Sequence, residues 1–239
     1  MRVLVVENIA DTSLGLVGEA LAEAGAEIVW SRPWSGEPLP DSPDHHDAIV
    51  VLGGEQSALD DHTHPYLPDL ARLMKHFGAV EKPVLGICLG SQLLARAHGG
   101  SNHLGVAPEF GWHAVSPTEA GSQDPVLSAV DGTFPIFEWH TDTFSLPEGA
   151  VRLATSHDVE NQAFRIGGKS YGMQFHFEAS IDVVEAWNRN YVDHIRRMNP
   201  NWHDEYEGHK RAHAEKSDAA GLAMARAWVG LIGQAIREA

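Results

Sequence analysis

The chain has 239 residues, enough for one domain whose hydrophobic core needs no disulfide or structural metal. Its formal net charge of −16 argues against a nucleic-acid partner, because binding a phosphate backbone requires clustered Lys and Arg. The single cysteine excludes an internal disulfide. With no leader-like N-terminus and no apolar run near the roughly 20 residues that cross a bilayer, the sequence predicts a cytoplasmic protein that does not enter a membrane.

The first half of the sequence alternates short apolar runs with helical patterns. Four runs rich in Val, Ile and Leu are expected to be buried strands. These strands cover residues 1–7, 27–30, 48–52 and 84–87. Helices are expected after Asp11 or Ser13, after Pro65, and from Gly90 to about His98. This order predicts an α/β fold with a doubly wound, mostly parallel sheet and helices on both faces.

The second half predicts a small additional, partly antiparallel sheet region. Its strands are expected at residues 112–115, 134–138, 151–154, 162–166 and 170–177. Ser180 can cap a helix over residues 181–197.

The C-terminal part ends in a helix expected over residues 217–237, after a polar, His-rich segment at 199–216. The apolar face of this helix, which includes Trp228, would be core or the seam of a homodimer. We therefore expect a main domain of residues 1–198 and a helical extension, residues 199–239, packed on the same domain.

The strongest local motif is Gly86-Ile87-Cys88-Leu89-Gly90, between a predicted strand and a predicted helix. A sharp strand-to-helix turn pushes a nucleophile out of the sheet, and the flanking glycines let strand and helix pack closely. The positive end of the helix dipole then favours the thiolate. The alternative is a buried structural cysteine, which is what most lone cysteines are.

A nucleophilic cysteine needs a base and a group that orients the base. The segment 171–178 supplies both if it is a strand, because residues two apart point to the same face. His176 and Glu178 would then project together, with Phe175 and Phe177 in the core. A carboxylate beside an imidazole fixes its tautomer and stabilises the imidazolium. The alternative for an isolated His-x-Glu pair is a solvated edge strand.

Gly53 and Gly54 follow a predicted strand, as Cys88 does. We expect them to be neighbours in space, since the C-terminal ends of parallel strands share one edge of a sheet. The backbone N–H of Leu89 and that of Gly53 or Gly54 would then form an oxyanion hole.

Four segments resemble class I glutamine amidotransferases and occur in the family's order. They are residues 52–54, 84–92, 139–149 and 171–178. The third, with Trp139-His-Thr-Asp142, is similar to a loop of the glutaminase part of GMP synthases. The resemblance covers roughly residues 1–190 and implies a flavodoxin-like fold in which the main domain is catalytic. Glu55 and Phe177 depart from the family, because proline is frequent at these positions.

The resemblance implies a role for each matching residue. Cys88 would attack the side-chain carboxamide of glutamine. His176 would protonate the departing ammonia and then activate water against the thioester, and Glu178 would orient His176. Gly54 and Leu89 would hold the oxyanion. The residues implied to contact the substrate are Gln92, His140, Thr141 and Asp142.

No synthetase segment follows, so we expect an ammonia acceptor to be a separate subunit in trans or to be lacking. One alternative is a stand-alone hydrolase of γ-glutamyl peptides or amides, with the same bond chemistry. Another is a non-catalytic relative that keeps the fold, against which the intact triad argues. Peptidase-like relatives with a Cys-His dipeptide at the elbow are disfavoured, because Leu89 follows Cys88.

Fifteen histidines raise the question of a metal. Pairs such as His62 with His64 and His209 with His213 have no cysteine partners and match no ligand set such as H-E-x-x-H. We therefore expect no functional metal and no cofactor.

Overall fold

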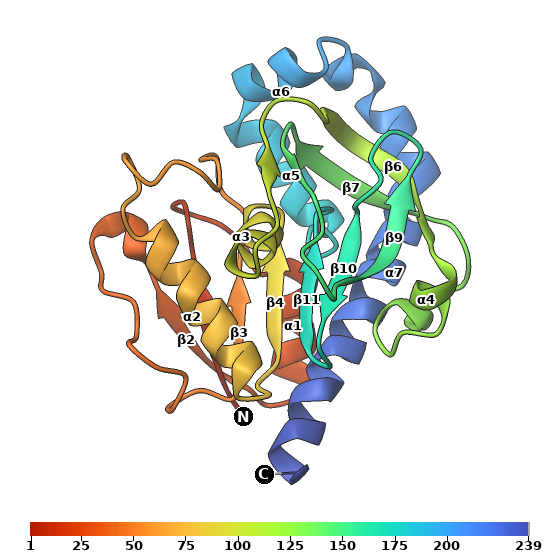
Figure 1. The fold of residues 1–239 in the computed structure, drawn as a ribbon. Coiled ribbons are helices and arrows are strands. Elements are labelled where there is room, and N and C mark those ends of the chain that lie inside the picture. The colour runs from red at the N-terminus through yellow and green to blue at the C-terminus, as the bar shows by residue number, and fades with distance from the viewer. Residues whose placement is uncertain (239) are drawn as a thin grey trace.

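A nine-stranded mixed sheet runs through the computed structural model, which describes residues 1–238 (Figure 1). The strand order is β2-β1-β3-β4-β11-β10-β9-β6-β7. The parallel strands are β2 (Glu27–Ser31), β1 (Arg2–Val6), β3 (Ala48–Val51), β4 (Val84–Ile87) and β11 (Ser170–Met173). The strands that continue the sheet antiparallel are β10 (Ala163–Ile166), β9 (Val151–Ser156), β6 (Glu109–Pro117) and β7 (Phe134–His140). A separate antiparallel pair consists of β5 (Asn102–His103) and β8 (Thr143–Phe144).

Helices cover both faces of the parallel half of the sheet. One face packs against α1 (Gly15–Glu23) and α7 (Trp202–Glu238), and the other against α2 (Leu67–Ala79) and α3 (Leu89–Ala97). In β1, Val3 and Val5 join the first core whereas Leu4 and Val6 join the second, as the alternation of side chains along a strand requires. The remaining elements are α4 (Glu119–Ser122), α5 (Ile181–Asn190), α6 (Val192–Met198) and single 3₁₀ turns at Pro33–Ser35 and Leu127–Ala129.

This architecture confirms the predicted α/β class, with a doubly wound sheet and a small antiparallel region. The predicted antiparallel strands mostly extend the main sheet, because β10 pairs with β11 and so joins the two halves. The parallel strands all end toward α5 and α6, at the top of Figure 1. The C-terminal edge of the sheet, where doubly wound folds bind ligands, therefore lies beneath these two helices.

Two predicted boundaries near the triad segment are wrong. The strand expected over 170–177 ends at Met173, so the His-x-Glu segment is irregular. The helix expected over 181–197 is broken at Tyr191 into α5 and α6.

The last helix begins at Trp202 rather than near Ser217. The polar segment before Ser217 also carries large aromatic side chains on one face. Trp202 and Tyr206 pack on Trp112, with ring centroids 5.8 and 6.2 Å away. A buried face of large rings can hold a helix whose other residues are solvated.

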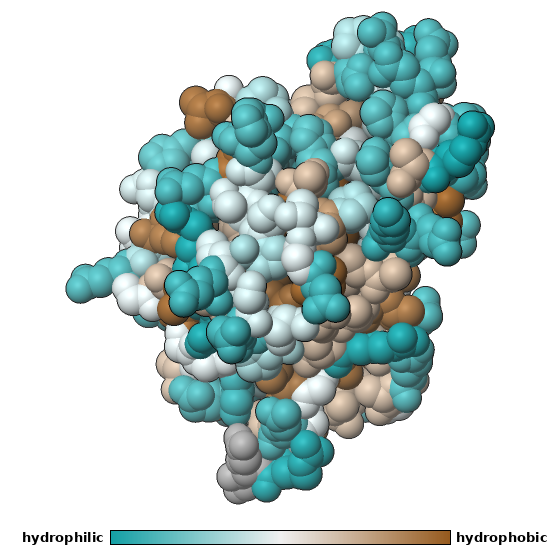
Figure 2. Space-filling model, turned by 90° about the vertical axis from the view of Figure 1, so that its right-hand side faces the viewer, coloured by the Kyte–Doolittle hydropathy of each residue, from teal (hydrophilic) through white to brown (hydrophobic). Residues whose placement is uncertain are grey.

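Helix α7 is long and apolar enough to cross a membrane by length and composition alone. Met224, Trp228 and Ile232 are nevertheless fully buried in the first core of this protein. On the face shown in Figure 2, hydrophilic side chains predominate and hydrophobic ones form small separate groups. This face shows no broad apolar band, and the buried side chains of α7 belong to the core.

Candidate active site

Cys88 lies on the sharp turn between β4 and α3 with a left-handed backbone, at φ 51° and ψ −108°. Positive φ is strained for a residue with a side chain and is tolerated where the surroundings fix it. The flanking glycines allow the close packing that fixes the backbone of Cys88. A Cβ on Gly86 would collide with the carbonyl of Gly90, and one on Gly90 with the carbonyl of Val51. The thiol sits at the N-terminus of α3, whose dipole favours a negative charge there.

His176 and Glu178 meet although they do not share a strand. His176 Nδ1 lies 2.7 Å from Glu178 Oε1, with both side chains buried. The backbone around them is held by hydrogen bonds to distant segments instead of the regular hydrogen bonds between strands. The His176 amide donates to the carbonyl of Phe137 at 2.8 Å, and the Leu16 amide of α1 donates to the carbonyl of Glu178 at 2.9 Å.

Two glycines let neighbouring helices press on this irregular segment. A Cβ on Gly15, at the start of α1, would collide with the carbonyl oxygen of Glu178. A Cβ on Gly221 of α7 would collide with the carbonyl oxygen of Phe177. The position of the His-x-Glu segment therefore depends on close packing of both α1 and α7.

The charges around His176 favour its imidazolium form. Burial alone would lower the pKa of His176, but the negative charges of Glu178 and Cys88 raise it well above the usual value. The Trp187 ring packs edge-on against the imidazole, with centroids 5.2 Å apart. Cys88 Sγ lies 3.7 Å from the carbonyl oxygen of Trp139. Such a pair of cysteine and charged histidine is suited to nucleophilic attack followed by proton donation.

The two glycines after β3 lie beside the cysteine, which confirms that they are neighbours in space. A Cβ on Gly53 would be 3.2 Å from His176 Cε1 and 3.5 Å from Cys88 Cβ. A Cβ on Gly54 would be 3.0 Å from Leu89 Cδ2. Leu89 is the first residue of α3, so its amide has no acceptor within the helix. This arrangement can supply backbone N–H donors to an oxyanion.

Gln92 lies one turn into α3, and its side chain borders the cavity. Its Nε2 lies 3.2 Å from Gln174 Oε1 and 3.5 Å from the carbonyl oxygen of Asp142. The Asp142 carboxylate accepts from the Gly105 amide at 2.8 Å and from the Thr141 hydroxyl at 3.2 Å. Thr141 and Asp142 thus border the cavity in a loop fixed by its own hydrogen bonds.

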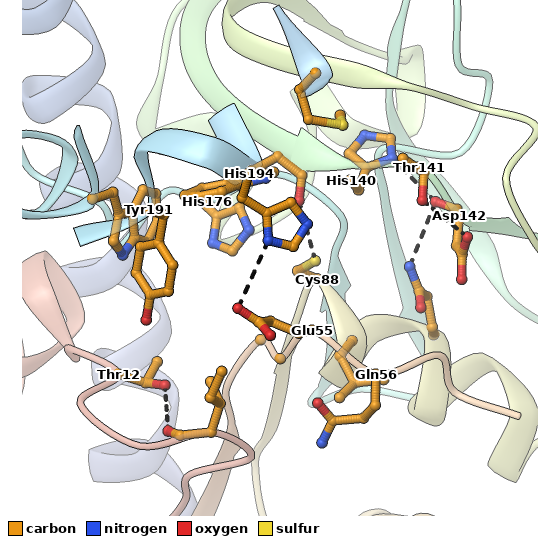
Figure 3. A pocket seen from close by; sticks show the side chains of 18 of the residues that line it. Thr12, Glu55, Gln56, Cys88, His140, Thr141, Asp142, His176, Tyr191 and His194 are labelled. Atoms are coloured by element: carbon orange, nitrogen blue, oxygen red, sulfur yellow. Dashed lines mark hydrogen bonds and ion pairs between the residues drawn. The ribbon is translucent and has the colours of Figure 1, made fainter. Parts of the chain in front are cut away.

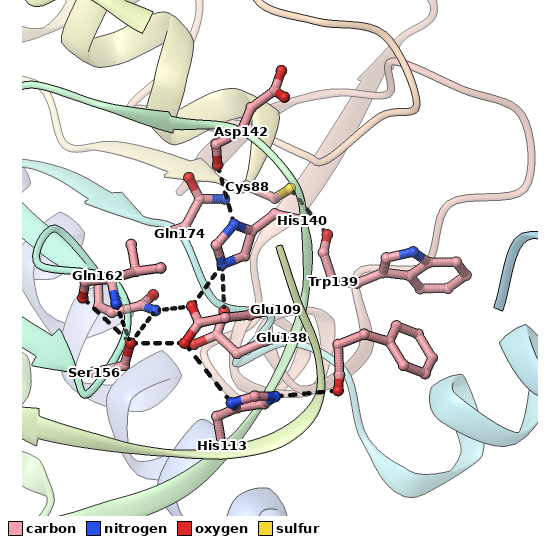
Figure 4. A network of polar contacts seen from close by, with 12 residues as sticks. Cys88, Glu109, His113, Glu138, Trp139, His140, Asp142, Ser156, Gln162 and Gln174 are labelled. Atoms are coloured by element: carbon pink, nitrogen blue, oxygen red, sulfur yellow. Dashed lines mark hydrogen bonds and ion pairs between the residues drawn. The ribbon is translucent and has the colours of Figure 1, made fainter. Parts of the chain in front are cut away.

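His140 borders the cavity, but both ring nitrogens contact protein groups (Figure 4). Nε2 lies 3.0 Å from Glu109 Oε2 and 3.2 Å from Glu138 Oε2, and Nδ1 lies 3.1 Å from the carbonyl oxygen of Asp142. Burial opposes the charge on His140, but the two carboxylates raise its pKa to about 10. His140 therefore links the loop of Asp142 to a buried acidic pair behind it.

Glu109, Glu138 and His140 also form a group of metal-ligand type, with atoms within 4.8 Å of one another. The imidazolium already bridges the two carboxylates at hydrogen-bonding distance, and Gln162 and Ser156 donate further hydrogen bonds to Glu109. The Glu138 carboxylate has no partner besides this imidazolium among the described residues, so the contacts satisfy Glu109 more fully than Glu138. That the protein needs no metal stays a prediction.

All the predicted site residues lie on one cavity of about 180 Å³ at the C-terminal edge of the sheet (Figure 3). The structure adds residues that the sequence did not single out. These are Ile9, Asp11, Thr12, Gln56, Trp187, Tyr191, His194 and Met198. The last four recur at intervals of four, three and four residues, a helical spacing that would have suggested one face directed at a site.

Comparison with known proteins agrees with this geometry. The sequence model of the family described as "Glutamine amidotransferase class-I" matches residues 14–186. The glutamine amidotransferase-like protein YfeJ of Salmonella typhimurium is 33% identical over 189 residues, which cover 78% of this chain and 79% of that one. A GMP synthase of Thermosipho africanus is 29% identical over 158 residues, 65% of this chain but only 29% of the larger protein.

A crystal structure of a glutamine amidotransferase from Thermotoga maritima superposes with a TM-score of 0.82 at 27% identity. The superposition covers 97% of this chain and 98% of that one, so the whole described fold is shared and no large element is unmatched. The family match spans the elbow, the glycines after β3 and the His-x-Glu segment. The chain belongs to the class I glutamine amidotransferase family.

Proposed function

We propose that the protein hydrolyses the side-chain amide of glutamine through a Cys88 thioester, with His176 and Glu178 completing the triad. The observation that carries this proposal is the strained left-handed Cys88 at a helix N-terminus, beside a buried His176 bonded to Glu178 at 2.7 Å. A structural cysteine needs neither the strain nor the charged partner.

The chemistry follows from the positions of these groups. The Cys88 thiolate attacks the amide carbonyl, and the oxyanion is held by the amides of Gly54 and Leu89. The imidazolium of His176 gives its proton to the nitrogen as the C–N bond breaks, leaving a thioester. His176 then takes a proton from water, which attacks the thioester and releases glutamate and the free thiolate.

The cavity divides at Cys88. Thr141 and Asp142 lie on the side away from His176, where the glutamyl backbone would bind, and Gln92 contacts the carbonyl oxygen of Asp142. No Lys or Arg borders the described cavity, so backbone amides and neutral donors such as Gln92 and Thr141 would hold the substrate carboxylate. The ammonia goes to an acceptor subunit in trans or to water, and we place the protein in the cytoplasm.

A second candidate is a hydrolase of larger γ-glutamyl amides. It is favoured by the cavity on the His176 side, which continues past the imidazole to Tyr191 and Thr12.

The test is release of glutamate and ammonia from glutamine by the purified chain, with Cys88→Ala as the control. Turnover lost in Cys88→Ala supports the proposal. Turnover that survives in this variant would exclude the thioester. A wild-type chain that neither turns over glutamine nor is labelled at Cys88 by a glutamine-like electrophile would indicate a non-catalytic relative.

A further inference from the structure

The cavity has unassigned space on the side from which a leaving group departs. Because His176 protonates the departing nitrogen, that nitrogen must lie on the imidazole side of the sulfur. In Figure 3, His176, Tyr191 and Thr12 lie on one side of Cys88, and Asp142 lies on the other. Ammonia needs no room beyond His176, yet the cavity continues to Tyr191 and Thr12. This end of the cavity can therefore hold a larger amine.

The wall of this space is aromatic. Trp187 packs on both His176 and Trp139, with ring centroids 5.2 and 5.3 Å apart. Tyr191 and His194 pack on the same Trp139 ring, at 5.7 and 6.1 Å. The family match ends at residue 186, so these wall residues lie in the part of the chain that the family's sequence model does not cover. The nucleophile and Trp139 lie inside this sequence match, whereas Trp187, Tyr191 and His194 follow it in the part of the chain that only the structural superposition covers.

The rim of the same space is acidic. Asp11 and Glu55 border the cavity and are both exposed to solvent. Burial raises the pKa of Tyr191, and the negative charges of Glu55 and Asp11 raise it further, so both carboxylates act on the same part of the cavity. The ring of His194 is also near this rim, with its Nδ1 3.8 Å from Glu55 Oε1. Glu55 is also the residue that replaces the family's frequent proline after the glycine pair.

We propose that this end of the cavity is a subsite for an organic amine that carries a positive charge, so that the preferred substrate is the γ-glutamyl amide of a diamine. Faces of aromatic rings together with carboxylates attract organic ammonium groups. The inference rests on the proposed cysteine chemistry, with the amine in place of ammonia. The C–N bond breaks as His176 protonates the amine nitrogen, and water then converts the thioester to glutamate.

The experiment compares four compounds on the full chain by kcat/KM. They are glutamine and the γ-glutamyl monoamides of 1,4-diaminobutane, butylamine and 4-aminobutyrate, which are cationic, neutral and anionic at nearly one length. We expect the cationic amide to be turned over fastest and the anionic one slowest. Binding to Cys88→Ala, measured by calorimetry, should follow the same order without turnover.

The variant that tests the rim is Asp11→Asn combined with Glu55→Gln. Asn tolerates the left-handed backbone of Asp11, at φ 62°, so the exchange removes charge without new strain. The ratio of kcat/KM for the cationic over the neutral amide should fall about tenfold, or about threefold for each exposed carboxylate. Asp131→Asn removes an exposed carboxylate that does not border the cavity and should leave this ratio unchanged.

The outcomes separate the two proposals. Cys88-dependent hydrolysis of glutamine, with no preference among the three amides, would overturn the subsite and leave the proposed function standing. An equal loss in Asp131→Asn would show a general effect of net charge and would also overturn the subsite. If no compound is turned over and none binds to Cys88→Ala, both proposals fail.

Discussion

Gly221 lies far along the chain from the candidate triad, yet α7 presses on the triad's backbone at this residue. A Cβ here would lie 2.8 Å from Leu16 Cδ1 and well under 3.0 Å from the carbonyl oxygen of Phe177, the residue before Glu178. Real Cβ atoms do not approach so closely, and a carbonyl cannot turn aside as a flexible side chain can. Gly221→Ala should therefore push the His-x-Glu segment away from α7.

Two effects of this substitution oppose each other. Alanine in a helix interior is favoured over glycine by about 1 kcal/mol. Overpacking of a tight contact costs about 1–3 kcal/mol, and the upper end applies because backbone must move. We therefore expect Gly221→Ala to lower the free energy of unfolding by about 1–2 kcal/mol, which is a fall in Tm of about 2–8 °C for a domain of this size.

Gly230→Ala and Gly208→Ala are the matched controls, because a Cβ at either position of α7 would meet nothing within 4 Å. Both should raise the free energy of unfolding by about 0.5–1 kcal/mol. Thermal unfolding measures all three variants, and a glutaminase assay measures the triad. A displacement near 1 Å should lower kcat about a hundredfold in Gly221→Ala alone. If Gly221→Ala stabilises as the controls do, α7 does not hold the triad segment.

Three further predictions concern the site. Glu178→Gln removes a charge that raises the pKa of His176, so the alkaline limb of kcat/KM should move to lower pH, and an unmoved limb would contradict that role. His140→Gln leaves two buried carboxylates without their cation and should cost about 3 kcal/mol at pH 7 by chemical denaturation. Folding raises the pKa of His140 from about 6.5 to about 10, so the stabilisation that its charge provides is complete below pH 6.5 and is lost as the pH rises toward 10. The free energy of unfolding of His140→Gln should therefore vary less with pH over this range than that of the wild type. Gly90→Ala should prevent α3 from packing on β3 and abolish expression of folded protein, whereas Gly99→Ala, with open space around it but a φ of 93°, should only destabilise.

The parallel half of the fold was predictable because its signals are local. Residues 84–87 are four consecutive buried residues and coincide with β4, and glycines and a proline mark the neighbouring helices. The elbow was predictable for the same reason, since a strand, a turn and a helix follow one another within one short segment. Periodicity and turn residues suffice where each element is defined by its own sequence.

The His-x-Glu segment was not predictable in the same way. Alternation of Phe175, His176, Phe177 and Glu178 resembles a strand, and a strand would also have brought the two polar groups together. The actual backbone is irregular and is fixed by Phe137, α1 and α7, which are distant in sequence. The prediction that the side chains meet was right although the reason given for it was wrong, because contacts between distant segments leave no local pattern.

The division of the cavity at Cys88 also bears on whether an acceptor subunit is required. An enzyme that passes ammonia to a partner needs an open route from the leaving nitrogen to the partner's surface. Here α5 and α6 stand over that side, and the His194–Glu55 pair spans from α6 to the loop after β3 at 3.8 Å. Such a half-exposed pair is worth at most about 1 kcal/mol, so it does not hold α6 firmly against this loop. A contact this weak would let a substrate amine exchange with solvent on this side, as the proposed subsite for a charged amine requires.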